Sequence, residues 1–288
     1  MINYLPYFLK KYVYHLTYLG YLPNTISPKT FNEKIHYRKK YWADPRYINQ
    51  SDKIAVKDYV AEKIDGEIVI PNLFVGGSLS VPELKKINKI NSGCVVKANH
   101  NSGPVFVLSG EESDERLGEV CDSISNQLTI DFGKVNGETW YSKIKPCILI
   151  EKKLETHGEP LLDYKFHVFR SDNGEQECVL HIDYDRETNH SRSLFTEDLT
   201  WLPFGIKYPV IHTSTLPPVN YEAMLDIAKS LASDHAYVRV DLYNINGRIY
   251  FGEMTFAHGA GWEGFTSKAH DKWLGSLWSM LKERAFSK

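Results

Sequence analysis

Three residues near the C-terminal end of the sequence, Arg239, Asp241 and Glu253, have the chemistry of a site for a cation and a phosphate. Two carboxylates held close together repel each other unless a cation lies between them. Hard oxygen ligands of this kind suit Mg²⁺, which proteins commonly hold together with the phosphates of a substrate. The arginine would add positive charge for an oxyanion or for a phosphoryl group in transfer.

A β-hairpin over residues 237–255 would bring these side chains together. Two runs of alternating apolar and polar residues flank Asn246 and Gly247, which form a strong local signal for a hairpin turn. Side chains alternate between the two faces of a strand, so Arg239 and Asp241 share one face of the first run. The sequence therefore predicts one polar face on this hairpin.

The length of the turn decides whether the two carboxylates meet. With a loop of three residues, Asn244 pairs with Arg248, and Asp241 and Glu253 become diagonal neighbours on one face. The arginine then lies between them, and Thr255 follows one step along. By the same reasoning, a two-residue loop would put the carboxylates on opposite faces. An ion pair between arginine and aspartate on an exposed sheet face, with Glu253 a bystander, remains an alternative.

A second candidate site lies upstream, in residues 94–108. An apolar strand ends at Lys97, a polar loop follows, and an apolar strand returns. Phosphate binding needs backbone that can turn its amide groups inward and a lysine that supplies a point charge. The alternative is an ordinary hairpin with a surface lysine. The polar loop consists of Asn99, His100, Asn101, Ser102 and Gly103.

Two further strands carry charged residues that could complete such a site. Residues 147–151 form an apolar strand that ends in Glu151 and runs into a short connector, where backbone groups could meet an adenine edge. Residues 161–170 place Asp163 and Lys165 on one strand face. The lysine could reach phosphates, and it could equally pair with the aspartate.

Composition and length set the frame for these motifs. The 288 residues, 42% of them hydrophobic, predict a globular chain with two or three subdomains around a cleft. Residues 1–60 hold ten Lys and Arg against four Asp and Glu. A solvated helix face is the favoured explanation, and an anionic partner or membrane surface is the alternative. The first 22 residues are too polar to span a membrane.

Cysteine and histidine spacing indicates no metal site. The four cysteines are far apart and match no zinc or redox spacing, which predicts reduced, mostly buried thiols in a cytosolic protein. Three histidines between residues 178 and 215 are not at ligand spacing either, and we expect them to hold no metal. They are His181, His190 and His212.

Several motifs together, in their order, resemble a known family. They are TFNEKIHYRKKYW, DKIAVKDYVAEKI, VVKANHNSG, ILIEKKL, DYKFHVF and VRVDLYNINGRIYFGEMTF. The sequence resembles the TupA-like ATP-grasp family of bacterial cell-surface polysaccharide biosynthesis, a branch of the ATP-grasp superfamily. The resemblance runs from about Thr30 to Gly275, and the joint occurrence of the motifs carries it.

The resemblance implies a fold and a division of the chain. The fold is α+β, with two α+β subdomains that grip ATP between antiparallel sheets and a helical N-terminal region. Residues 1–90 would form this N-terminal region, residues 91–155 the lid subdomain, and residues 156–288 the catalytic subdomain with the C-terminal helix.

The resemblance also implies roles for single residues. Lys97 and Lys165 would contact the phosphates of ATP, and Arg239 and Lys165 would act on the reacting phosphoryl and tetrahedral species. The loop that closes over the phosphates would be Asn99, His100, Asn101, Ser102 and Gly103. The adenine hinge would include Glu151, Lys152 and Leu154. Mg²⁺ would bind Asp241, Glu253 and Thr255, although many relatives have asparagine at this last position.

The activity that follows from the resemblance is an ATP- and Mg²⁺-dependent carboxylate-amine ligase that works through an acylphosphate. The expected partners are a uronic-acid-containing glycan or its precursor and an amine, with no nucleic acid. The expected location is cytoplasmic, with peripheral contact at the inner membrane face. The alternatives are a glycan kinase or glycosyltransferase of the same pathway, and a nucleotide-binding protein without turnover.

Overall fold

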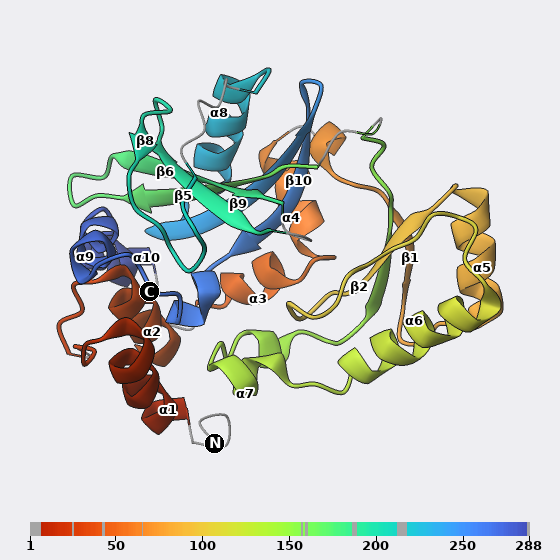
Figure 1. Cartoon of the computed structure of the whole chain (residues 1–288), viewed down its shortest axis with the longest axis horizontal. Helices are drawn as coiled ribbons and strands as arrows, with labels where there is room; N and C mark the ends of the chain where they lie inside the picture. Colours follow the sequence, from red (N-terminus) through yellow and green to blue (C-terminus); the bar gives the residue numbers. More distant parts are fainter. Residues whose placement is uncertain are drawn as a thin grey trace.

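Two antiparallel sheets, each with its own helices, make up the computed structural model of the chain (Figure 1). Every strand pair within the named sheets is antiparallel, which confirms the α+β class expected from the sequence. The structure describes residues 7–24, 26–41, 44–64, 66–156, 158, 161–185, 189–211 and 218–286.

The larger sheet has six strands in the order β10-β9-β5-β6-β7-β8. Their bounds are β5 Asp163–Arg170, β6 Gln176–Tyr184, β7 Ser191–Thr196, β8 Trp201–Leu202, β9 Tyr237–Ile245 and β10 Arg248–Thr255. One face is apolar and packs against α8 (Tyr221–Leu231), where the Phe166 and Tyr221 rings stack at 6.2 Å. Because side chains alternate, the opposite face of β5 and β9 carries the charged residues.

Several helices pack at the edge of this sheet and below it in Figure 1. They are α1 Tyr7–Tyr14, α2 Phe31–Tyr41, α3 Arg46–Ser51, α4 Val56–Lys63, α9 Lys268–Ser276 and α10 Met280–Phe286, with the short turns η2 His15–Leu19, η3 Gly66–Ile68 and η5 His258–Gly261. Among the described residues, no helix is long and apolar enough to cross a membrane.

Three basic residues of α2 are structural, so the solvated helix face expected for the basic N-terminal part is wrong for them, whereas Lys40 is exposed. Lys34, Arg38 and Lys39 are all buried. Lys34 donates to the carbonyl oxygens of Gly275 and Trp278, at 2.7 and 2.5 Å. These bonds satisfy the end of α9, where carbonyl groups lack partners within the helix.

The smaller unit has four strands in the order β1-β4-β2-β3, with α5 and α6 packed on one face. Their bounds are β1 Asn72–Gly76, β2 Cys94–Ala98, β3 Phe106–Val107, β4 Ile148–Lys152, α5 Val81–Ile90 and α6 Asp114–Gln127. Since β1 pairs with β4, this unit reaches back to Asn72, whereas the sequence division places residues 72–90 in the N-terminal region. Between α6 and β4 lie α7 (Phe132–Asn136) and η4 (Tyr141–Lys143).

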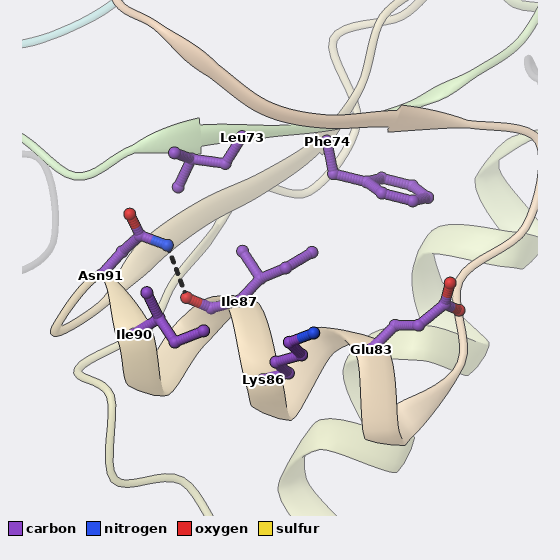
Figure 2. Close-up of a pocket in the computed structure, with 7 residues that line it drawn as sticks. All are labelled: Leu73, Phe74, Glu83, Lys86, Ile87, Ile90 and Asn91. Atoms are coloured by element: carbon purple, nitrogen blue, oxygen red, sulfur yellow. Dashed lines mark hydrogen bonds between the residues drawn. The ribbon is translucent and has the colours of Figure 1, made fainter.

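A small hollow of about 240 Å³ lies between β1 and α5 (Figure 2). Leu73 and Phe74 line it from the strand, and Ile87 and Ile90 line it from the helix. None of the residues predicted to bind ATP or metal lines this hollow, so it belongs to the packing of the smaller unit.

Asp52 separates two of these helices. It ends α3 with an extended backbone and its carboxylate accepts from the Ile54 amide at 2.9 Å, and α4 begins at Val56. The last helical pattern divides into α9 and α10. The four cysteines are free thiols, and three of them are buried, as expected.

Candidate active site

The hairpin that carries the acidic residues turns on two residues. Asn246 and Gly247 both have positive φ, at 52° and 87°, and Arg248 pairs with Ile245. Turns with two left-handed residues suit the twist of antiparallel strands, and an Asn-Gly pair adopts them readily. The predicted three-residue loop, with Asn244 opposite Arg248, is therefore wrong.

A β-bulge restores the alignment that the shorter turn would destroy. The register shifts by one residue between Phe251 and Glu253, so Gly252 is the extra residue and Glu253 lies directly opposite Asp241. Thr255 lies opposite the arginine two positions before Asp241. The expectation that a two-residue loop would separate the carboxylates is wrong for this reason.

Arg239 links the two carboxylates. Its Nε and Nη2 donate to Asp241 at 2.6 and 2.7 Å, and Nη2 also donates to Glu253 Oε1 at 2.8 Å. Thr255 Oγ1 donates to the same glutamate oxygen at 3.0 Å. Burial works against the charge of Arg239, but Asp241 and Glu253 together raise its pKa above the ordinary value.

Lys165 approaches the same cluster from β5, the neighbouring strand. It is buried, its ammonium group binds Asp163, and it lies 3.1 Å from Asp241 Oδ2. The pairing with Asp163, which the sequence left open, is thus present. A contact between Lys165 and phosphate stays a prediction.

A divalent cation fits this donor set. Three carboxylates, those of Asp163, Asp241 and Glu253, face the cations Lys165 and Arg239, which leaves one formal negative charge. Glu253 keeps 36% of its side chain exposed, so its oxygens remain accessible from solvent. Carboxylate and hydroxyl oxygens are ligands that Mg²⁺ accepts. Asp241, Glu253 and Thr255 would hold the ion.

A buried histidine holds Arg239 from the opposite side. His258, in the turn after β10, accepts from Arg239 Nη1 through Nδ1 at 2.7 Å, and its Nε2 lies 3.1 Å from Glu263. Glu263 also pairs with Arg192 at 2.9 Å. Burial lowers the pKa of His258, which favours the neutral ring that can accept this bond.

Two more histidines extend this network. Ligand atoms of His167, His181 and His258 lie within 4.8 Å of one another. His167 and His181 also bond to each other at 3.3 Å, and His181 bonds to Asp183 at 3.0 Å. Burial lowers the pKa of both rings; Arg192 adds to the shift of both, and Arg239 adds to that of His167. We interpret the group as a network of neutral side chains. His212 lies outside the described residues.

The smaller sheet contributes a second charged face. Lys97 on β2 and Lys57 on α4 each lie 2.5 Å from a different oxygen of Glu151. Burial opposes the charge of Glu151, but the two lysines lower its pKa. Glu151 therefore fixes the position of Lys97. The contact of Lys97 with phosphate stays a prediction.

The polar loop after β2 is built by its own side chains. Asn99 donates to Asp52 and accepts from the Cys147 amide at 2.8 Å, and Asn101 accepts from the Gly103 amide at 2.9 Å. His100 Nε2 lies 3.3 Å from the Ile130 carbonyl. These three polar side chains are buried. If the loop closes over phosphates, exposed Ser102, half-buried Gly103 and backbone amides are the groups available for the contact.

The predicted adenine hinge follows β4. The strand ends at Lys152, whose side chain is exposed and whose amide donates to the Pro71 carbonyl at 3.1 Å. Leu154 is half-buried in the connector to β5. The described residues 153–156 after the strand form neither helix nor strand, and adenine binding by Glu151, Lys152 and Leu154 stays a prediction.

A cavity of about 680 Å³ lies between the hairpin and the polar loop, and Lys97, Glu151, Lys165 and Asp241 are not among the residues that line it. Arg239, Glu253 and Thr255 line it from the hairpin, and Ser102 lines it from the polar loop. The sequence analysis did not identify Glu138, which lines the same cavity from the segment after α7. Ser102 of the polar loop and the hairpin therefore face a common space.

The sequence analysis also did not identify Lys53, which lies between the two units. Its ammonium group donates to the Asn101 carbonyl at 2.6 Å. Burial lowers its pKa, while Glu253, Lys97 and Glu151 are all close enough to act on its charge. A lysine inside a short helical pattern gives no signal of such a position, because helix periodicity says nothing about distant strands.

Comparison with known proteins identifies the family. The sequence profile described as TupA-like ATPgrasp matches residues 33–279. The chain belongs to the TupA-like ATP-grasp family. The resemblance seen in the sequence motifs and the expected ATP-grasp fold are thereby confirmed. No curated protein sequence matches the chain at a significant level.

Solved ATP-grasp structures are similar at low identity. D-Alanine-D-alanine ligase from Helicobacter pylori is 15% identical, with a TM-score of 0.45 over 80% of this chain and 63% of that one. The Bacillus anthracis enzyme complexed with ATP is 17% identical, with a TM-score of 0.40 over 83% and 66%. The ligase PsnB, with Mg and ADP, is 12% identical, with a TM-score of 0.39 over 74% and 51%. This TupA-like chain thus spans about half to two thirds of their lengths.

Proposed function

We propose that this TupA-like ATP-grasp protein is an ATP- and Mg²⁺-dependent ligase that joins a carboxylate to an amine. The observation that carries the proposal is the pair Asp241 and Glu253, which face each other across the hairpin with Arg239 bonded to both. The arginine and Glu253 line a cavity that also meets the polar loop. A charged cluster beside such a space suits phosphoryl transfer.

The reaction has two steps. An oxygen of the carboxylate substrate attacks the γ-phosphorus of ATP, a new P–O bond forms, and the bond to the β-phosphate oxygen breaks to release ADP. The amine then attacks the acyl carbon, a C–N bond forms, and phosphate leaves as the nitrogen loses its proton. Catalysis of the first step needs positioning and charge neutralisation, without a covalent nucleophile on the enzyme.

The residues of this chain supply those needs. Arg239 would donate to the oxygens that gain charge in both steps, and Lys97 would hold phosphate oxygens from the smaller sheet. Backbone amides near Ser102 and Gly103 would contact the same phosphates. When bound by Asp241 and Glu253, Mg²⁺ would neutralise phosphate charge. Loss of one such charge typically costs about 100-fold in rate.

The finer assignment concerns the substrates. The carboxylate would be a hexuronic acid of a surface glycan or its precursor, and the amine an amino acid or another small amine. The association of the TupA-like family with cell-surface polysaccharide biosynthesis supports this choice. Exposed Tyr18 lines the cavity, and with exposed Leu16 and Leu22 of the same segment it would suit a lipid-linked glycan precursor at the inner membrane face.

The test is a reconstitution with purified protein, ATP, Mg²⁺, a panel of uronic acids and a panel of amines. ADP release that requires both a uronic acid and an amine, with an amide detected by mass spectrometry, is the expected result. A stable phosphorylated sugar formed without amine would indicate a kinase. Consumption of a nucleotide sugar would indicate a glycosyltransferase, and no turnover with any pair would contradict the ligase.

A further inference from the structure

Glu138 is a carboxylate in the cavity wall that the phosphoryl-transfer machinery does not use. It follows α7 and its side chain is buried, with 5% of the residue exposed. Among the described residues, no hydrogen bond or ion pair engages its carboxylate. Burial raises its pKa to about 7, Lys39 opposes the shift, and Glu253 adds to it. A buried acid in this state lacks a close positive partner.

The neighbouring cation, Lys39, is committed elsewhere. Its ammonium group donates to the carbonyl oxygens of Asn136 and Ala260, at 2.9 and 2.6 Å. These bonds tie the segment before Glu138 to the turn after β10. Lys39 therefore acts on the charge of Glu138 from a distance and fixes the two walls of the cavity.

The rest of the wall near Glu138 suits a cation. Tyr141 lies close enough to Glu138, Glu253 and Arg239 for all three to shift the pKa of its phenol. Tyr14 and Trp262 also line the cavity, with ring centroids 5.1 Å apart. Aromatic faces attract a positive charge, and the Lys39 ammonium group already lies 5.1 Å from the Trp262 ring centroid, so Tyr14 and Tyr141 are the rings nearer to an added cation.

We propose that Glu138 binds the ammonium group of the amine substrate, in a subsite walled by Tyr14, Tyr141 and Trp262. This inference rests on the proposed ligase function and assigns its second substrate to a place. A primary amine arrives as a cation at neutral pH, and Glu138 offers it a charge-assisted hydrogen bond. Because Tyr141 is also near Arg239 and Glu253, an amine held here approaches the reacting end of the site.

The charges of the cavity assign the two substrates to different walls. The carboxylate substrate needs positive charge, which Arg239 provides on the hairpin wall. Glu138 would repel a carboxylate in the cavity. Glu263, a further acid on the wall, is already paired with Arg192 and Lys207, so Glu138 is the better anion for an incoming ammonium group.

Two nucleophiles of different charge test the subsite. Hydroxylamine is uncharged at neutral pH and captures an acylphosphate as a hydroxamate, whereas glycine and ethanolamine carry an ammonium group. Glu138→Gln should raise the KM for the charged amines at least tenfold, because the variant loses a hydrogen bond between two charged groups. Hydroxamate formation should stay within twofold of the unaltered protein. Glu222→Gln, an exposed change on α8, is the matched control.

The proposal is overturned if Glu138→Gln lowers the formation of both products equally, or if it lowers neither. A second arm needs no turnover: saturation-transfer NMR should detect ethanolamine bound to the unaltered protein and to Glu222→Gln, and not to Glu138→Gln. Ethylene glycol, the uncharged analogue, should give the same signal in all three. If the unaltered protein makes neither product, the ligase is ruled out, and equal ethanolamine signals in all three proteins would rule out the subsite.

Discussion

Asp241 and Glu253 lie directly opposite each other on β9 and β10 because the bulge at Gly252 shifts the register by one residue. Without the bulge, the pairing of Arg248 with Ile245 would continue along the hairpin and place Val240 opposite Glu253. Opposite residues share a face, so Glu253 would then point to the apolar side of the sheet. The candidate metal site therefore depends on one glycine as much as on its acids.

Gly252→Ala tests the role of the bulge. A Cβ at this position would lie 3.1 Å from the Asp241 carbonyl oxygen and 3.2 Å from the Tyr243 ring, which is closer than most such contacts. Because the carbonyl belongs to the neighbouring strand, the hairpin must shift by a few tenths of an ångström. We expect the ADP release rate to fall about 10-fold, with a loss of about 1 kcal/mol in the free energy of unfolding. Unchanged kinetics with Mg²⁺ would contradict this account.

Asp241→Asn tests the carboxylate pair itself. The amide keeps the shape of the side chain and removes one negative charge between Arg239 and Lys165. We expect ADP release to fall by about 100-fold, and circular dichroism to show the same fold. Asp226→Asn, an exposed change on α8, should leave the rate unaltered. An Asp241→Asn protein that loses its fold and regains activity in the cold would assign the residue a structural role.

Sequence reasoning identified the strands and faces of the site well, because alternation along a strand determines which residues share a face. It placed Arg239 and Asp241 on one face, and the structure agrees. It could not determine the register between strands, which depends on turn length and bulges. A glycine inside a strand pattern, as at Gly252, signals a bulge without locating its partner residues.

Contacts between segments that are distant in the chain could not be predicted from the sequence, for a different reason. Glu138 lies in a short segment without periodicity, and folding alone brings it to the cavity that contains Glu253. The polar residues Asn99 and Asn101 suggested ligand contacts, but their side chains bond within the protein. Residue type indicates what a side chain can bind, while the neighbours that satisfy it emerge from packing.

His258 should position Arg239 without touching substrate. Its Nδ1 accepts from Nη1 at 2.7 Å, so removal of the acceptor frees one side of the guanidinium. We expect His258→Leu to lower kcat about 10-fold with little change in the KM for ATP. His258→Asn, whose amide oxygen can replace Nδ1 as an acceptor, should recover most of the rate. Equal kcat values for the two variants would contradict a positioning role.

Glu138 should make stability depend on pH. Its pKa is about 7 in the folded protein, above the ordinary value of 4.5, so the folded state binds more protons between these values. Its contribution to stability is therefore complete below about pH 4.5 and is lost as the pH rises through 7, about 3 kcal/mol in all. Glu138→Gln removes this pH-dependent contribution to the free energy of unfolding.

Urea unfolding at pH 4 and pH 8.5, without nucleotide or divalent cation, measures the effect. The unaltered protein should lose about 3 kcal/mol more than Glu138→Gln between the two pH values. The difference between the two proteins isolates Glu138, because Lys39, Tyr141 and Glu253 remain in both. Parallel curves for the two proteins would show that the carboxyl pKa is the same in the folded and unfolded states, which would contradict this account.

The C-terminal helix should depend on one buried ion pair. Arg38 on α2 donates through Nε and Nη2 to Glu283 on α10, at 2.6 and 2.5 Å, and both side chains are buried. Glu283→Gln leaves the guanidinium charge buried without its counter-charge, so we expect the free energy of unfolding to fall by about 3–5 kcal/mol. Replacement of both residues, Arg38→Met with Glu283→Gln, removes the unpaired charge and should recover much of that loss. Urea denaturation of the unaltered protein, of Arg38→Met, of Glu283→Gln and of the double variant measures the coupling. A loss below about 1 kcal/mol in Glu283→Gln would show that water or another acid compensates the arginine.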